Sequence, residues 1–380
     1  MNDYRIVVRD TPTSTEARTW DFNPQVTDLR WKSRLPGGDD TMDVGIGPDG
    51  GEPVYGYLRI PFDVPLLSHI ELWRGMTLLW TGHVMDRTFD GPDIAGLSCE
   101  GYARTLYDET FITTPTVYND MPGGQLVQLL LRYSQWITAN RFGFLELPGP
   151  PMSDPDGKRR WLGSVGSVLD EVAKLGSAGV PLDWIVNRDR QLTFIERRPP
   201  AQPDYHVPHE RGLTTYAESA RTLFGEVTVG YWDEGGNESE TVTADGFVDE
   251  WRVQRATTIK AEAGLSNAEL EAIGKAFLSS ASTPEVRASV KRLRGRGLET
   301  PSGAVRPAWA ADAGEWFRIG DRPGQICVSA THNGNTEDHA FELGAPLRSI
   351  VNTIRESRRL GEAYRDGVNP VTSQQKGWSS

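Results

Sequence analysis

Cysteine is scarce in this chain, and its scarcity limits what can hold the fold together. Only Cys99 and Cys327 are present among 380 residues, and they lie in separate halves of the chain. Two such distant residues are better explained as reduced, buried strand residues than as a disulfide or a metal pair. We therefore expect a fold that depends on an apolar core.

Long apolar runs are also missing. No stretch of 18 apolar residues occurs, so no transmembrane helix is expected, and hydrophobic residues make up 38% of the chain. The first residues, Met-Asn-Asp-Tyr-Arg, lack the basic and then apolar layout of a signal peptide. These features are typical of a globular protein that is made in a cytoplasm and does not insert into a membrane.

Excess positive charge is absent, because the formal net charge is −12. Proteins that bind nucleic acid neutralise phosphates with concentrated lysine and arginine, so this balance argues against a nucleic-acid-binding surface. It is compatible with DNA that passes the protein without adhering to it.

Signatures of catalysis are missing too. The sequence contains no HExxH motif, P-loop or dinucleotide fingerprint, and the segment 163–166 opens a helix instead of forming a nucleophile elbow. The neighbouring Asp39 and Asp40 indicate surface acids, which by themselves do not make a glycosidase pair. We expect no enzyme activity, no catalytic residue and no cofactor.

Two groups of polar residues contain side chains of the types that bind metal ions. His206 and His209, followed by Glu210, could offer a metal pair, but no further ligand is evident in this proline-rich stretch, which favours an exposed loop. The acidic, glycine-rich segments 37–43 and 47–52 lack the alternating oxygen ligands of an EF-hand loop. We expect mobile surface loops there and no metal site.

Turn-forming residues are abundant instead, with 40 glycines and 25 prolines spread along the chain. Residues 1–112 alternate between strand-like segments and turns at a spacing of about 10 residues, which predicts an N-terminal β-barrel domain. The predicted strands are 4–8, 26–32, 55–61, 70–73, 78–84 and 94–100.

The periodicity changes between residues 113 and 205. Apolar residues at helical spacing predict one helix after Pro122 and another from about Ser164 to Leu175. A hairpin of strands 182–186 and 191–195 follows, so this part is predicted to be a small α+β insert. The four prolines between 199 and 208 make that stretch the best linker candidate.

Residues 206–362 return to β character, with one helix that begins at a capping box of Ser266 and Glu269. The last strands are predicted at 289–293, 316–319, 325–330 and 339–343, and residues 363–380 form a polar, flexible tail. The fold class is therefore mainly β, with two similar small β-barrel domains that flank a small α+β domain. The chain near 97–106 loosely matches that near 341–350, which leaves a true internal duplication open.

The hairpin at 69–84 poses a specific question, because Trp73 and Trp80 flank its Arg74-Gly75 turn. The two indoles could stack on a sugar, or they could pack in the core or at a subunit interface. We interpret Leu72, Leu78 and Val84 as one buried face. Trp73 and Trp80 are then interface candidates on the opposite face, where a neighbouring domain or subunit would cover them.

Three stretches carry a resemblance to a known family. They are Leu-Leu-Trp-Thr-Gly-His-Val with Leu-Ser-Cys-Glu-Gly-Tyr, then Asp-Trp-Ile-Val-Asn-Arg-Asp-Arg-Gln-Leu-Thr-Phe, and finally Glu-Val-Thr-Val-Gly-Tyr with Trp-Phe-Arg-Ile-Gly-Asp321. In this order the chain resembles the tail-tip baseplate hub proteins of long-tailed bacteriophages, which include minor tail proteins and the N-terminal hub part of tail-associated lysins.

The resemblance implies a virion structural protein, assembled in the host cytoplasm and located at the tail tip. Such hubs form a homotrimer whose duplicated barrels make a ring that caps the tail tube, adapts sixfold to threefold symmetry and surrounds the DNA exit channel. Implied partners are a distal tail or tail tube protein ring, a tape measure protein, and tip fibre or receptor-binding proteins. DNA ejection would bring DNA past the ring only as a passing polymer.

Two alternatives stay open at this point. A hexameric distal tail protein would occupy the same assembly with different symmetry. A carbohydrate-binding adhesin module would belong to another class and would use Trp73 and Trp80 as exposed stacking residues. The family resemblance supplies no catalytic residues.

Overall fold

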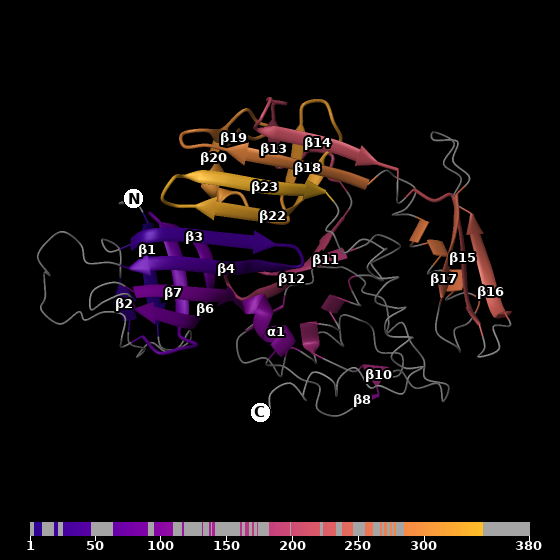
Figure 1. Ribbon diagram of the computed structural model, residues 1–380, viewed down its shortest axis with the longest axis horizontal. Coiled ribbons are helices and arrows are strands. Elements are labelled where there is room, and N and C mark those ends of the chain that lie inside the picture. The colour runs from indigo at the N-terminus through magenta and orange to yellow at the C-terminus, as the bar shows by residue number, and fades with distance from the viewer. Residues whose placement is uncertain are drawn as a thin grey trace, which may run out of the picture. The chain divides into compact units, whose positions relative to one another are not determined.

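The chain is built mainly from β-strands, as the computed structural model shows (Figure 1). It divides into two compact units, one that joins Met1–Glu218 to Val286–Gly344 and one that contains Ser219–Glu285. The predicted mainly β fold class is confirmed.

The structure describes residues 4–9, 19–21, 26–46, 64–89, 95–108, 116–117, 131, 137, 139–140, 160–161, 164–166, 169–170, 173, 182–197, 199–220, 223–232, 238–245, 255–260, 267, 270–271, 274–275, 277–278 and 285–344.

Seven strands form a curled sheet that we call the N-terminal barrel. They pair antiparallel in the order β2–β1–β5–β6–β7–β4–β3. Alternate residues point inward, and the resulting core contains Trp31, Met42 and Trp80. The strands are β1 (Tyr4–Arg9), β2 (Thr19–Asp21), β3 (Val26–Arg34), β4 (Gly37–Ile46), β5 (His69–Arg74), β6 (Thr77–Phe89) and β7 (Ala95–Gly101).

A second curled sheet, the C-terminal barrel, has a core centred on Phe317 and Phe341. Its strands β18, β23, β22 and β21 pair antiparallel in that order, and β13 joins β21 in parallel and β19 antiparallel. The strands are β13 (Tyr205–Val207), β14 (Thr214–Ser219), β18 (Glu285–Arg292), β19 (Gly297–Glu299), β20 (Val305–Pro307), β21 (Trp316–Ile319), β22 (Gln325–Asn333) and β23 (Asp338–Gly344), with the 3-10 turn η3 (Ala308–Ala310) before β21.

The two barrels share one hydrogen-bonded ladder. Strand β22 pairs antiparallel with β3, from Ser329 opposite Arg34 to Asn333 opposite Arg30. Figure 1 shows β22 and β23 lying alongside β3 and β4, so the sheet continues from one barrel into the other. We call this ladder, with the side chains packed beside it, the seam.

The middle of the chain contributes the hairpin of β11 (Leu182–Val186) and β12 (Gln191–Glu196), close to its predicted bounds. Strand β11 extends the N-terminal barrel by pairing in parallel with β4 at Gly37 and Gly38. Val165 and Leu169, which lie in the predicted second helix, are buried helical positions against this hairpin, and so is Ala173. The remaining elements here are η2 (Tyr102–Arg104), α1 (Thr105–Asp108), β8 (Thr116–Val117), β9 (Ala139–Asn140) and β10 (Arg160–Trp161).

The second unit contains its own small sheet, in which β15 (Glu226–Trp232) lies between β16 (Glu238–Asp245) and β17 (Ala256–Lys260). Val227 and Val229 pack in one core cluster with the helical positions Leu270 and Phe277. The boundaries that we set at residues 112, 205 and 362 stay a prediction. Within 206–362, the structure sets this three-stranded sheet apart from the C-terminal barrel.

Two local expectations are wrong. The segment 37–43 is no mobile surface loop but the start of β4, because Met42 and Val44 alternate inward along it. The stretch 199–208 is no simple linker, since Tyr205 and Val207 are 1% and 2% exposed and place β13 in the C-terminal barrel. The predicted loop at 47–52, the strand at 55–61, the capping box at Ser266, the tail at 363–380 and, apart from the helical position Leu131, the first helix of the insert lie outside the described residues.

Candidate functional site: a polar junction between the barrels

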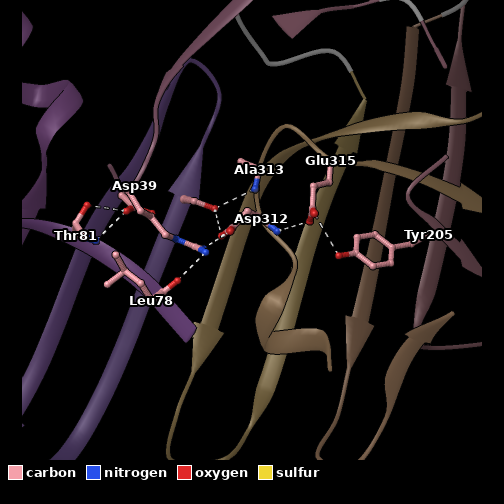
Figure 2. Close-up of polar contacts among 9 residues, drawn as sticks. Asp39, Leu78, Thr81, Tyr205, Asp312, Ala313 and Glu315 are labelled. Carbon is pink, nitrogen blue, oxygen red and sulfur yellow. Dashed lines mark hydrogen bonds and ion pairs between the residues drawn. The ribbon is translucent and has the colours of Figure 1, made fainter. Parts of the chain in front are cut away.

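Three segments that are distant in sequence bring charged side chains together beside the seam (Figure 2). Asp39 comes from β4 of the N-terminal barrel, and Arg188 comes from the turn between β11 and β12. Asp312 and Glu315 come from the loop that leads into β21 of the C-terminal barrel. We call these four residues, with their hydrogen-bond partners, the polar junction.

Arg188 occupies the centre of the junction. Its Nη2 forms an ion pair with Asp312 Oδ2, and its Nη1 donates a hydrogen bond of 2.9 Å to the carbonyl oxygen of Leu78 in β6. The turn that carries it is fixed by Asn187, whose Oδ1 accepts the backbone N–H of Gln191 at 2.9 Å. One guanidinium therefore contacts both barrels from a third segment.

The C-terminal side of the junction is a chain of hydrogen bonds. Ser33 Oγ donates to Asp312 Oδ1 at 3.3 Å and accepts the backbone N–H of Ala313 at 3.0 Å. Glu315 Oε2 accepts the backbone N–H of Asp312 at 2.7 Å, and Glu315 Oε1 accepts the Tyr205 hydroxyl at 3.2 Å. The loop before β21 is thus tied to β3 on one side and to β13 on the other.

The N-terminal side rests on Asp39. Its Oδ2 accepts the backbone N–H of Thr81 at 2.8 Å, and the Thr81 hydroxyl lies 3.4 Å from the same oxygen. Strand β7 passes so close here that a Cβ at Gly101 would collide with the backbone carbonyl of Asp39. The backbone of three strands, β4, β6 and β7, therefore fixes the position of this carboxyl group.

Burial raises the carboxyl pKa values of the junction. It raises the pKa of Asp39 to about 7, against the opposing charge of Arg188, and it raises the pKa of Glu315 to about 7, with Asp312 adding to the effect. Burial also raises the pKa of Asp312. Burial alone would lower the pKa of Arg188, but Asp312 and Asp39 outweigh it and the pKa is raised. One cation thus faces three acids whose pKa values are all raised, and those of Asp39 and Glu315 lie near neutral pH.

A second charged contact joins the barrels at the tip of the β5–β6 hairpin. Arg74 Nη2 lies 3.0 Å from Glu337 Oε1 in the turn between β22 and β23, and Arg74 Nη1 donates to the Tyr4 hydroxyl at 2.8 Å. The guanidinium also lies 4.9 Å from the ring centre of Trp309 in η3. Arg74, which the sequence placed only in a turn, therefore connects both barrels.

The interface assignment of Trp80 is wrong. Its side chain is fully buried in the core of the N-terminal barrel. Alternate residues of a strand share a face, so Trp80 points to the same inward face as the buried Val84, four residues further along β6. Trp73 is half-buried and its Nε1 donates to Glu71 at 2.8 Å, so its place at an interface stays a prediction. A sugar-stacking pair of exposed indoles is not available, since Trp80 has no exposed surface.

The other residues singled out in the sequence do not join the junction. His206 lies in β13, and the exposed His209 shares a hydrogen bond of 2.9 Å with Thr214. Glu210 pairs with Arg296 at 2.5 Å. In the part of the chain that the structure describes, no three acids, histidines or cysteines are grouped to hold a metal ion. No described helix is long and apolar enough to cross a membrane.

The space beside the junction is small. A cavity of about 10 Å³ next to Asp39 is lined by Arg34, Gly37 and Arg104 among others. Such a volume admits about one water molecule, whereas small-molecule sites occupy about 300–1,000 Å³. The geometry is suited to holding segments together.

Three solved structures are similar to the chain along nearly its whole length, each with a TM-score of 0.58. A tail protein from Neisseria meningitidis MC58 is 14% identical over 90% of this chain and 96% of that one. The 43 kDa tail protein of prophage MuSo2 from Shewanella oneidensis is 12% identical over 90% and 98%. Prophage tail protein gp18 from Listeria monocytogenes EGD-e is 11% identical over 94% and 99%.

The chain has the fold of these tail proteins. No protein-family model and no curated protein matches the sequence. The tail-protein fold includes both barrels, because the similarity covers at least 90% of the chain. The roles of Asp39, Arg188 and Asp312 rest on their geometry in this chain.

Proposed function

We propose that the chain is a structural protein of a phage tail, and within the tail the hub subunit of the tip baseplate. The observation that carries this proposal is the tail-protein fold, which extends over 96–99% of the three similar chains. In this proposal the protein acts by assembly in the virion and has no enzyme activity.

Two barrels joined by one ladder are suited to a ring. Three copies of the chain would supply six barrels, which could dock on a sixfold tail tube and present threefold symmetry to the tip. The ladder between β3 and β22 and the contacts of Arg188 and Arg74 would keep the two barrels of each copy in register. The ring would dock on a tail tube or distal tail protein, on the tape measure protein and on tip fibres.

The net charge of −12 suits a ring around a DNA exit channel, because DNA repels a surface of like charge and does not adhere. DNA would then pass during ejection as an excluded polymer. No base-specific contact is required for this role.

Light scattering after size-exclusion chromatography tests the proposed state of assembly. The expected mass is three times the chain mass of 42.1 kDa, at concentrations that favour assembly. Six copies would favour the hexameric distal tail protein instead. A stable monomer that is absent from purified virions would contradict both.

A further inference from the structure

The β5–β6 hairpin exposes apolar side chains at both of its ends. Just before β5, Leu66 and Leu67 are 50% and 45% exposed, and Met85 of β6 is exposed as well. At the turn between the strands, Met76 is 94% exposed. Single exposed apolar residues are ordinary, but groups of them mark contact surfaces. At about 3.3 Å per strand residue, the two groups lie about 25 Å apart along the hairpin.

The backbone holds Leu67 in a strained conformation. The Ser68 N–H donates to Pro65 O at 3.3 Å and closes a turn in which Leu67 has φ 64. Glycine or asparagine is favoured at such a position, because a bulky side chain is strained there. The Leu67 N–H also donates to Val84 O at 2.7 Å, which places Leu67 beside Met85.

Met85 is displayed by an irregularity in β6. Val84 and Asp86 pair with successive residues of β7, so Met85 between them is the extra residue of a β-bulge. Bulges redirect side chains and recur next to functional sites. Two separate local distortions therefore present Leu67 and Met85 on the surface. We call this group the basal patch, which contains Leu66, Leu67, Met85 and Asp86.

The exposed charge next to the basal patch is negative. Asp86 and Asp43, both exposed, lie opposite Ser98 of β7 from its two sides, and Ser98 Oγ donates to Asp43 at 2.8 Å. Arg30 follows in the same row, but it already lies 3.8 Å from Asp28. The apolar side chains are therefore bordered by acids.

The other end of the hairpin combines apolar and basic residues. Arg74 and Arg294 both lie against Glu337, at 3.0 and 3.9 Å, which brings the turn between β18 and β19 next to the hairpin tip. That turn exposes Leu293. We call this second group the tip patch, which contains Met76, Leu293 and Arg294.

The exposed charge at the tip patch is positive. Arg294 and Arg296 are 80% and 51% exposed, whereas their acidic partners Glu337 and Glu210 are mostly covered. Asp338 at the start of β23 is an exposed acid at this end. Two exposed cations thus stand against one exposed acid.

The two patches are complementary, and one chain carries both. A contact of either patch with its own copy would bring Asp86 against Asp86 or Arg294 against Arg294, and like charges disfavour both arrangements. A contact between the basal patch and the tip patch pairs opposite charges and covers apolar side chains on both sides. Because the two patches differ, this contact is head-to-tail, and its repetition forms a ring where the rotation closes.

We propose that one copy of the chain packs its basal patch against the tip patch of the next copy, so that the β5–β6 hairpin supplies both halves of the contact between neighbours. This inference rests on the proposed ring and names the surfaces that close it. In the closed ring every copy covers both patches, and Asp86 faces Arg294 of the adjacent copy.

Two variants that each disable one patch test the contact. Leu67→Asn makes the basal patch polar, and Met76→Asp places an acid on the tip patch. In light scattering after size-exclusion chromatography, each variant should need at least tenfold more protein than the unaltered chain to form trimers. An equal mixture retains one intact contact per pair, so it should form dimers at a concentration at which neither variant assembles alone. A mixture without dimers would overturn the proposal.

Thermal unfolding separates loss of the contact from loss of the fold. Asparagine is favoured at the backbone conformation of residue 67, so Leu67→Asn should unfold at the same temperature as the unaltered chain or higher. The control Val305→Asp also changes an exposed apolar residue, on β20 outside both patches, and should assemble like the unaltered chain. Equal losses of assembly in Val305→Asp and Met76→Asp would overturn the proposal.

Charge reversal tests the match between the patches. Asp86→Arg and Arg294→Asp should each weaken assembly, because each places like charges across the contact. The two substitutions together in one chain restore opposite charges and should recover most of the lost assembly. A double variant that assembles as weakly as the single variants would contradict the pairing of Asp86 with Arg294.

The outcomes also distinguish this contact from the proposed function. Trimers that form equally well in the unaltered chain and in all of these variants would overturn the contact and leave the proposed ring intact. A stable monomer of the unaltered chain would contradict both.

Discussion

At the scale of single residues, Arg188 makes the contacts that connect three segments of the chain. It pairs with Asp312 and donates to Leu78 O, and both charged side chains are 25% exposed. Removing one partner from a pair at the edge of the interior costs more than removing one from an exposed pair and less than removing one from a fully buried pair. Its removal would also leave three acids without their cation.

We therefore expect Arg188→Met to lower the free energy of unfolding by about 2 kcal/mol at pH 8, between the limits for exposed and buried pairs. Urea denaturation measures this change. The control Arg30→Met removes a weak pair with Asp28 at 3.8 Å on a side chain that is 65% exposed, and should cost less than about 0.5 kcal/mol. Equal costs for the two variants would argue against the central position of Arg188.

The acids of the junction predict a pH dependence of stability. The pKa values of Asp39 and Glu315 are raised to about 7 from 3.8 and 4.5, so the folded protein binds more protons than the unfolded chain between these values. The resulting stabilisation is complete at low pH and is lost as pH rises through about 7.

Between pH 6 and pH 8.5 the free energy of unfolding of the unaltered chain should therefore fall. Asp39→Asn keeps an acceptor for the Thr81 N–H but cannot ionise, so its stability should fall less over the same range. Parallel chemical denaturation of both proteins across this range measures the difference. Identical slopes would show that Asp39 does not titrate here.

At the scale of elements, the start of β4 depends on glycine. Gly38 has φ +95, and a Cβ there would collide with the backbone carbonyl of Val186 in β11. Gly75 in the β5–β6 turn has φ +57 but has open space around it. Both positions favour glycine, and only the first combines the strain with a close backbone contact.

Gly38→Ala should therefore destabilise the chain by about 2 kcal/mol or more, and Gly75→Ala by only about 1 kcal/mol, since the second adds backbone strain alone. Thermal unfolding of the two variants side by side measures the difference. A Gly38→Ala protein as stable as Gly75→Ala would mean that β4 and β11 can move apart without cost.

Elements with regular alternation were predictable from the sequence, and those with interrupted patterns were not. The hairpin 182–196 and the strand Trp316–Ile319 match their predicted positions closely. Strand β4 was missed because glycines and acids precede its apolar residues. Strand β13 was missed because prolines surround its three residues.

The junction itself left no local signal in the sequence. Arg188 and Asp312 are 124 residues apart, and Asp39 comes from a third segment, so only the folded topology brings them together. The one available hint was the pair of acids at 39 and 40, which we interpreted as surface residues. The burial of Trp80 was predictable, because alternate residues of a strand share a face and Val84, four residues away, was assigned to the buried face.

At the scale of the whole molecule, the two barrels of the first unit are connected by the β3–β22 ladder, by two charged contacts, by the hydrogen bonds of Ser33 and by an apolar cluster that includes Leu35 and Trp316. Arg188 acts at the polar junction, and Arg74 acts at the hairpin tip. In the proposed ring both barrels of each copy would dock on the tail tube, and these contacts would keep the two barrels in a fixed arrangement. The tail-protein fold and these contacts therefore support the same proposal.

A reconstruction of the virion tail tip by electron cryomicroscopy tests the hub proposal most directly. It should show three copies of the chain whose six barrels form a closed ring around the channel, between the tail tube and the tip. Six copies in a sixfold ring, or no density for the chain in the tail, would contradict the hub.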